Sequence, residues 1–236
     1  MIDSVLNYAS NNFDSFVTDL SNCLQFPSIS TLSHHGSDVI DCAEFVSNHL
    51  THIGLQHVTL INDYGAPIIY ADYIVNDSLP TLLIYGHYDV QPADPVELWD
   101  SPPFEPTISH GYIVARGASD NKGMFYAQIK AVESFLKVNG ECPINVKFLI
   151  EGEEEIGSQG LMQFIVDQRD LLSHDVMLVS DSPKFSSNTP SLCQSIRGLV
   201  YLEVTVEALH SDVHSGQLGG GVPNVIHYIS DCISSM

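Results

Sequence analysis

Residues 81–89 read TLLIYGHYD, in which an apolar run, TLLIY (81–85), precedes a histidine and an aspartate. A continuous apolar run of this length is typical of a β-strand that is covered on both faces. Similar runs occur at residues 145–150 and 176–179, and segments with helical spacing of apolar residues lie between the runs, at 121–138 and 159–168. Strands that alternate with helices predict an α/β sandwich around a largely parallel sheet.

The sequence before this core predicts two helices and two strands. Helical spacing covers residues 12–24 and 38–53, and β-rich runs follow at 57–61 and 67–75. After the core strand, residues 86–109 are rich in Pro and Asp, which predicts a long loop of the kind that often carries function. A short strand is expected at residues 112–115, and Asp120 occupies the expected N-cap position of the helix at 121–138.

The pattern changes after residue 195. Residues 199–206 alternate as in a strand, a Gly-rich loop covers 215–221, and helical spacing begins at Pro223. We therefore expect residues 1–195 to form the N-terminal part of one α/β domain and residues 196–236 to begin a second, α+β unit. About 40 residues are too few for a stable domain, so we expect this second unit to be incomplete.

Composition excludes several classes of partner. The net charge is −21, from 29 acidic and 8 basic side chains, so neither nucleic acid nor an anionic membrane is expected to bind. The five cysteines form no CxxC pair, which argues against a thiolate zinc site and a disulfide framework and favours a reducing, cytoplasmic setting. A signal peptide is not recognisable, and no apolar run approaches the ~20 residues of a membrane span.

Four clusters of His, Asp and Glu stand where a strand is expected to end. They are His87 with Asp89, then Asp120, then the acidic run EGEEEIGS at residues 151–158, and finally Asp181. Each has a simple alternative explanation: a surface histidine with a turn aspartate, a helix cap, a solvated acidic loop, and a turn aspartate. In open α/β sheets, however, sites form at the carboxyl ends of strands, where all four clusters would meet.

Together, these clusters indicate a metal site. Adjacent carboxylates repel one another unless water or a cation screens them. Imidazole and oxygen ligands without thiolate suit zinc, and also manganese or cobalt, in a catalytic site.

The motifs that carry the clusters resemble those of the co-catalytic zinc exopeptidase and deacylase family. The matching stretches are GHYDVQP (86–92), WDSPPFEP (99–106), ARGASDNKG (115–123), EGEEEIGS (151–158), SD (180–181), RGL (197–199) and DVHSG (212–216). The first three are most similar to the dipeptidase branch, which includes carnosinase-like enzymes. The resemblance implies a phosphorylase/hydrolase-like α/β/α catalytic domain followed by an α+β lid, through which a homodimer can form.

The resemblance also implies a role for each site residue. Two divalent ions, most readily zinc, would be held by His87, Asp120, Glu155 and Asp181, with Asp120 between the two ions. Asp89 would orient His87. Glu154 would act as the general base on a water that the metals activate, and His214 from the lid would stabilise the oxyanion. The implied activity is that of a metallopeptidase that hydrolyses the amide bond of dipeptides or short peptides.

Two alternatives to this activity remain open. Acetylornithine deacetylase and succinyl-diaminopimelate desuccinylase belong to the same family, so an acyl-amino acid is a second possible substrate. Family members also take a histidine ligand of the second metal, and an arginine that binds the substrate carboxylate, from further along their chains than residue 236. We therefore expect weaker occupancy of that metal and little activity from these 236 residues alone. A truncated homologue that binds metal without catalysis is the third interpretation.

Overall fold

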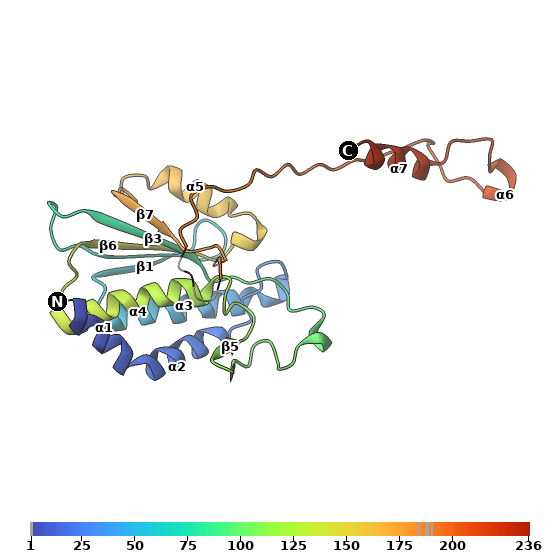
Figure 1. Cartoon of the computed structure of the whole chain (residues 1–236). Helices are drawn as coiled ribbons and strands as arrows, with labels where there is room; N and C mark the ends of the chain where they lie inside the picture. Colours follow the sequence, from blue (N-terminus) through green and yellow to red (C-terminus); the bar gives the residue numbers. More distant parts are fainter. Residues whose placement is uncertain (1, 184, 187–188, 190) are drawn as a thin grey trace. The chain divides into compact units, whose positions relative to one another are not determined.

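The computed structural model describes residues 2–183, 185–186, 189 and 191–236. The chain divides into two compact units, Met1–Pro183 and Lys184–Met236. The first unit is built on a five-stranded sheet with the order β1-β2-β6-β3-β7 (Figure 1). The strands are β1 (His57–Ile61), β2 (Ile68–Tyr73), β3 (Thr81–His87), β6 (Asn145–Glu151) and β7 (Val176–Val179). The domain boundary after residue 195 stays a proposal.

The sheet is mixed. Strand β3 pairs in parallel with both β6 and β7, whereas β2 is antiparallel to β6 and to β1. Since β1 and β6 both run opposite to β2, four of the five strands point the same way. The links from β3 to β6 and from β6 to β7 pass through helices α4 (Lys122–Asn139) and α5 (Gln159–Asp167), as parallel neighbours require. The predicted α/β architecture is confirmed, with β2 as the reversed strand.

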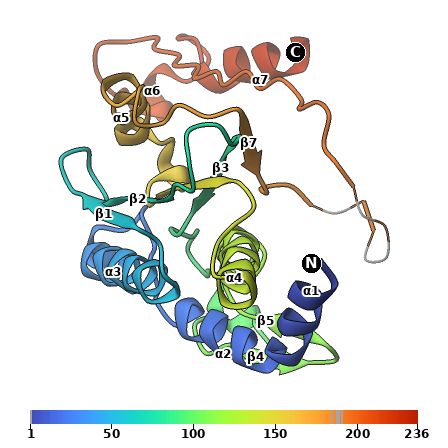
Figure 2. The ribbon, with the colours of Figure 1, turned by 90° about the vertical axis from the view of Figure 1, so that its left-hand side faces the viewer.

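Helices cover both faces of the sheet because successive strand residues point to opposite faces. Ile84 of β3 and Phe148 of β6 pack into a core with α4 and with α3 (Gly36–Ile53). Their neighbours Leu83 and Leu149 pack on the other face with Phe164 of α5. Figure 2 shows α3 and α4 on one side of the sheet and α5 on the other. Burial on both faces explains why these strands read as apolar runs rather than as alternating patterns.

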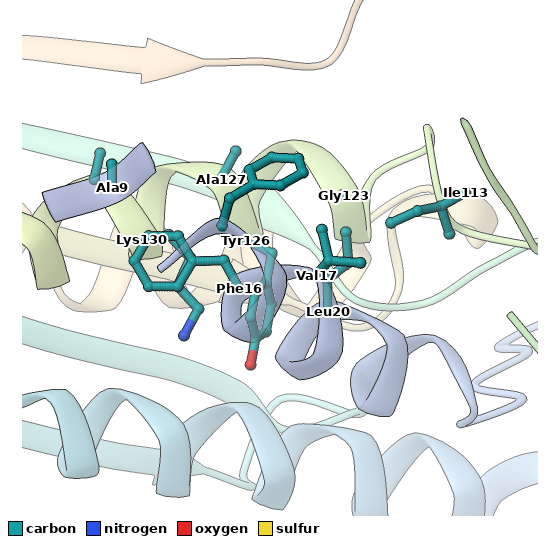
Figure 3. Close-up of a pocket in the computed structure, with 11 residues that line it drawn as sticks. Ala9, Phe16, Val17, Leu20, Ile113, Gly123, Tyr126, Ala127 and Lys130 are labelled. Atoms are coloured by element: carbon teal, nitrogen blue, oxygen red, sulfur yellow. The ribbon is translucent and has the colours of Figure 1, made fainter. Parts of the chain in front are cut away.

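An outer layer of helices lies against α4. Helices α1 (Ile2–Asn11) and α2 (Phe13–Leu24) pack on it, and a pocket of about 390 Å³ with a largely apolar lining opens between them (Figure 3). Helix α1 was not expected from the sequence. Its apolar residues Ile2, Val5, Leu6 and Ala9 do have helical spacing, but only Val5 is buried in the structure.

The long segment after β3 is held in place by its own contacts. It contains a short hairpin of β4 (Thr107–Ser109) and β5 (Tyr112–Val114), of which only β5 was expected. The guanidinium group of Arg116 lies over the Trp99 ring at 5.3 Å, and its Nη2 donates to the Pro92 carbonyl at 2.9 Å. The indole of Trp99 donates to the carbonyl of Ala93 at 2.9 Å. These contacts fix the loop that follows His87.

The second unit contains α6 (Ser215–Leu218) and α7 (Val225–Ser235). Asn224 caps α7, since its side chain accepts a hydrogen bond from the Ile226 amide at 3.0 Å. The prediction of a strand at residues 199–206 is wrong, because the structure has no strand in this stretch. A lone segment has no hydrogen-bonding neighbour to make it a strand, whatever its alternation. Within the described residues of the whole chain, no helix combines the length and apolarity needed to cross a bilayer.

Candidate metal centre

Four segments meet at the carboxyl ends of β3, β6 and β7. His87 is the last residue of β3, and Asp120 precedes α4. Glu154 and Glu155 lie in a short 3-10 helix, η3 (Glu154–Ile156), that follows β6, and Asp181 follows β7. The predicted site residues of the first unit therefore lie at one edge of the sheet, because parallel strands end together there.

His87 is at the centre of this group. Its side chain is fully buried, and its Nδ1 lies 3.1 Å from the carbonyl oxygen of Asp89. Because a carbonyl can only accept, Nδ1 carries a proton, and Nε2 faces the carboxylates. The Nε2 atom lies 3.0 Å from Asp120 Oδ1 and 3.7 Å from Asp181 Oδ2. Glu154 Oε2 is 3.9 Å away.

These donors form two groups with metal-ligand spacing. The ligand atoms of His87, Asp120 and Asp181 lie within 4.8 Å of one another, and so do those of His87, Glu154 and Glu155. His87 belongs to both groups. All four residues predicted as metal ligands, together with the predicted base, are thus brought together, while their individual roles remain predictions.

The buried carboxylate of Asp89 connects the parts of the site. Its Oδ1 lies 3.3 Å from His87 Nδ1 and accepts from the Glu154 amide at 3.2 Å. Its Oδ2 accepts from the Glu155 amide at 3.1 Å and from the Ser30 hydroxyl at 2.6 Å. One side chain therefore fixes the orientation of the imidazole and the position of η3. Sequence reasoning expected the contact with His87 and missed the other three.

Asp120 is not the N-cap of α4, contrary to the expectation from the sequence. The N-cap residue is Asn121, which makes no side-chain capping bond. Its amide instead donates to the Ser180 carbonyl at 2.8 Å and to Asp181 Oδ1 at 3.0 Å, while its Oδ1 accepts from the His87 amide at 3.3 Å. Asn121 thus ties the ends of β3 and β7 together, and the carboxylate of Asp120 is left free to face His87. The peptide bond between Asp120 and Asn121 is cis.

Two more residues of the site were not foreseen. Gln91 Nε2 donates to Glu155 Oε2 at 2.8 Å and orients that carboxylate. Glu151, the last residue of β6, is buried, and its Oε1 accepts from Tyr85 and from Ser158 at 2.7 and 2.8 Å. Burial raises the pKa of Glu151. Gln91 belongs to the GHYDVQP motif and Glu151 to the acidic run, but nothing in their spacing shows which carboxylate or hydroxyl each would meet.

The electrostatics of the site favour a positive charge between the carboxylates. Burial by itself would lower the pKa of His87, but its hydrogen bond and charge interaction with Asp89, together with Asp181 and Glu154, raise it to about 9. Burial raises the pKa of Glu154, opposed by His87 and reinforced by Glu155, Asp181 and Asp89. Without a metal, the site therefore keeps an extra proton at neutral pH.

The donor set fits a divalent cation. In the described part of the chain, no Lys or Arg forms an ion pair with Asp120, Glu154, Glu155 or Asp181. Among these same residues, the only cation beside the carboxylates is the protonated imidazole, whose Nε2 is the atom that a metal would take. Imidazole with several carboxylates suits zinc, manganese or cobalt. Asp89 on the far side of the ring is the usual partner of a metal-bound histidine.

His214 belongs to the second unit. It is the N-cap of α6, and its Nδ1 accepts from the Gly216 amide at 3.0 Å, which leaves Nε2 as its free ring nitrogen. Its expected role at the oxyanion stays a prediction.

Comparisons with known proteins agree with this chemistry. Residues 83–214 match Peptidase family M20/M25/M40. The chain is 32% identical to the Cys-Gly metallodipeptidase dug1 of Schizosaccharomyces pombe, over 94% of this chain and 49% of the relative. It is 38% identical to the Beta-Ala-His dipeptidase of Mus musculus, over 65% of this chain and 32% of the relative. The chain thus spans about half or less of these curated relatives.

Solved structures show the same relationship. The dipeptidase Dug1p of Saccharomyces cerevisiae aligns with a TM-score of 0.81 and 26% identity, covering 100% of this chain and 52% of that chain. Human carnosine dipeptidase 1 aligns with a TM-score of 0.73 and 30% identity, over 77% of this chain and 41% of that chain.

Proposed function

Because the chain belongs to Peptidase family M20/M25/M40, we propose that it carries the metal site of a dipeptidase that hydrolyses the amide bond of short peptides. The observation that carries the proposal is the convergence of His87, Asp120, Glu154, Glu155 and Asp181 in two overlapping groups of metal-ligand spacing. We propose that His87, Asp120, Glu155 and Asp181 would hold two divalent ions, zinc first. Family membership implies a divalent metal; the number and the element are part of this proposal.

Each residue of the proposed site has its own role in the reaction. Divalent ions in such a site act as Lewis acids toward water and toward the substrate carbonyl. Glu154 takes the proton of the attacking water, since its carboxylate faces the site and its raised pKa lies nearer to neutrality than that of an ordinary glutamate. It then returns the proton to the leaving amine. Asp89 keeps the imidazole of His87 in place throughout, and Gln91 does the same for Glu155.

The relatives favour dipeptides over acylated amino acids. The curated relatives described above are dipeptidases, for Cys-Gly and for Beta-Ala-His. We therefore propose an unblocked dipeptide as the substrate class. A homodimer formed through residues 196–236 and a cytoplasmic location also remain proposals.

Metal binding is the first test, since it needs only residues that the structure brings together. The purified chain is incubated with Zn²⁺, desalted and analysed by mass spectrometry for bound metal. We expect bound zinc in the wild type and a loss of at least one ion in Asp120→Ala, with Asp100→Ala, an exposed aspartate outside the site, as the matched control. Equal zinc content in wild type and Asp120→Ala would contradict the proposed site.

Hydrolysis is the second test. The metal-loaded protein is incubated with Cys-Gly and with β-Ala-His, and in parallel with N-acetyl and N-succinyl amino acids. We expect the free dipeptides to be cleaved in preference to the acylated amino acids, at the low rate expected of these 236 residues alone, and we expect Glu154→Gln to lower that rate by about 10²–10⁴-fold while it retains metal. Cleavage of the acylated amino acids alone would favour the deacylase branch instead. In the same assay, His214→Ala tests the oxyanion role by its effect on kcat.

A further inference from the structure

A segment far from the metal motifs supports the loop that carries His87. Residues 28–30 follow α2 and lie against residues 88–90. The Ser28 hydroxyl donates to the Tyr88 carbonyl at 2.6 Å, and the Val90 amide donates to the Ser28 carbonyl at 3.0 Å. Ser28 and Ile29 are both buried, so the backbone of this segment is anchored independently of its last residue.

That last residue, Ser30, reaches the site itself. Its hydroxyl donates to Asp89 Oδ2 at 2.6 Å, a short contact of the kind made by a hydroxyl with a charged carboxylate. The other donors to this carboxylate come from His87 and from the amides of η3. Within the described part of the chain, Ser30 therefore supplies the one hydrogen bond to Asp89 that comes from neither a proposed ligand nor the proposed base.

We propose that Ser30 is a positioning residue of the metal site, acting through Asp89. The inference rests on the proposed function. With its hydroxyl in place, the fully buried carboxylate of Asp89 is held in one rotamer, facing both the His87 ring and η3. Without the hydroxyl, Oδ2 keeps only the amide of Glu155, so the carboxylate is held by fewer contacts and fixes the orientation of the His87 ring less firmly. Partners of this kind typically change metal affinity by about 10- to 100-fold.

The structure also supplies a conservative replacement. Ser30 lines a cavity of about 520 Å³, so the extra methyl group of threonine has room while its hydroxyl can make the same bond. Ser134 is the matched control, since its buried hydroxyl donates to the Lys130 carbonyl within α4 and contacts no residue of the site. Ser30→Ala, Ser30→Thr and Ser134→Ala thus separate positioning from general packing.

The experiment measures zinc affinity by competition with a chromophoric chelator, together with the visible absorption spectrum of the Co²⁺-loaded chain. We expect Ser30→Ala to weaken zinc binding by about 10-fold and to change the Co²⁺ spectrum. Ser30→Thr should restore both, and Ser134→Ala should leave both as in the wild type. Thermal melting of the metal-free proteins verifies that each variant is folded.

The other outcomes are distinguishable. If Ser30→Ala binds zinc and gives the Co²⁺ spectrum of the wild type, Ser30 has no positioning role, although the proposed metal site stands. If Ser134→Ala weakens zinc binding as much as Ser30→Ala, the effect is one of general packing and the inference is again wrong. If the wild type binds no zinc, the proposed function is wrong and the inference falls with it.

Discussion

At Gly86 the fold leaves no space for a side chain. A Cβ atom there would lie 2.5 Å from the Cβ of Phe125 and 3.0 Å from Oδ1 of Asn121, the atom that accepts from the His87 amide. We expect Gly86→Ala to lower the free energy of unfolding by about 1–3 kcal/mol, as overpacking of a core does, and to displace Asn121 from the ends of β3 and β7. Urea denaturation measures the first effect, and zinc affinity measures the second.

Gly36→Ala is the control for this substitution. Gly36 begins α3 with helical backbone angles, and nothing lies within 4 Å of the position that a Cβ atom would take there. Alanine is a better helix former than glycine, so stability should stay the same or rise slightly. A Gly86→Ala protein as stable as Gly36→Ala would show that Phe125 moves aside at little cost.

His49 gives the protein a pH dependence away from the metal centre. Burial, followed by the charge of Lys130, lowers the pKa of His49 to about 4, and the Lys130 ammonium donates to its Nε2 at 2.8 Å. An unfolded histidine titrates near 6.5, so between pH 6.5 and pH 4 the unfolded state binds more protons than the folded state. The contribution of neutral His49 to the free energy of unfolding is therefore fully present above pH 6.5 and decreases as the pH falls toward 4.

The variant His49→Gln tests this, because its side-chain oxygen can accept from Lys130 without titrating. Between pH 7 and pH 4.5 the wild type should lose about 2 kcal/mol more of its unfolding free energy than the variant. Chemical denaturation at a series of pH values gives the difference. Parallel curves for the two proteins would show that His49 is not held neutral in the folded state.

Individual residues show which parts of the site could be predicted from the sequence and which could not. The residues at the strand ends were identifiable, since their motifs and their position after apolar runs both indicate function. Ser30 was not, because it lies in a loop whose composition is ordinary and because its partner Asp89 is distant in the sequence. Asp120 was expected at the N-cap of the helix and also, from the resemblance, as a metal ligand; the N-cap is Asn121 instead, and Asp120 lies beside His87.

Among the elements, α4 is held to α2 and α3 by one buried cation. Lys130 of α4 donates to Asp19 of α2 at 2.6 Å, to His49 of α3 at 2.8 Å, and to Glu133 at 2.8 Å. Its ammonium also lies 4.9 Å from the centroid of the Phe16 ring. In Figure 3, the ends of the Lys130 and Tyr126 side chains lie on the side toward α3.

Lys130→Met should lower the free energy of unfolding by about 3 kcal/mol, because removing one partner leaves Asp19 and Glu133 without their cation. Denaturant unfolding followed by circular dichroism measures the loss. Lys137→Met, at an exposed position in the last turn of the same helix, should change stability by less than about 0.5 kcal/mol. Equal losses in both variants would mean that methionine itself is unfavourable in α4, and not that the buried cation matters.

Helices and strands could be predicted from the sequence where burial leaves a local pattern of apolar residues. Strands β3 and β6 differ from their expected limits only at their ends, since both are buried between helices. Strand β7 also has the expected limits, although it lies at the edge of the sheet and three of its four residues are exposed. Helix α1 was missed although its apolar residues have helical spacing, and the structure shows that it is held by contacts with α4, which is distant in the sequence. The stretch at residues 199–206 was misjudged for the opposite reason: it has the alternation of a strand but no paired neighbour in the structure.

For the whole molecule, metal removal should lower stability. An ion that binds only the folded state stabilises it by about 2.7 kcal/mol at a free concentration 100 times its Kd. For a chain of this size, that corresponds to a rise in Tm of roughly 5–10 °C. Differential scanning calorimetry with Zn²⁺ and with excess chelator measures the difference. Asp120→Ala, which should lose at least one ion, should show a smaller rise, and a full zinc-dependent rise in that variant would place the bound metal elsewhere.

The donors at the sheet edge come from four separate segments, and no segment contributes a complete set. Before β7 pairs with β3, His87 and Asp120 lack Asp181 as a neighbour. A chain in this state would bind an ion in that group only weakly. An ion held by all four segments would therefore bind only once the sheet is complete, and it would act as a non-covalent cross-link between strands that lie far apart along the chain. Release of the ion would then be an early sign that the strands of the sheet have begun to separate.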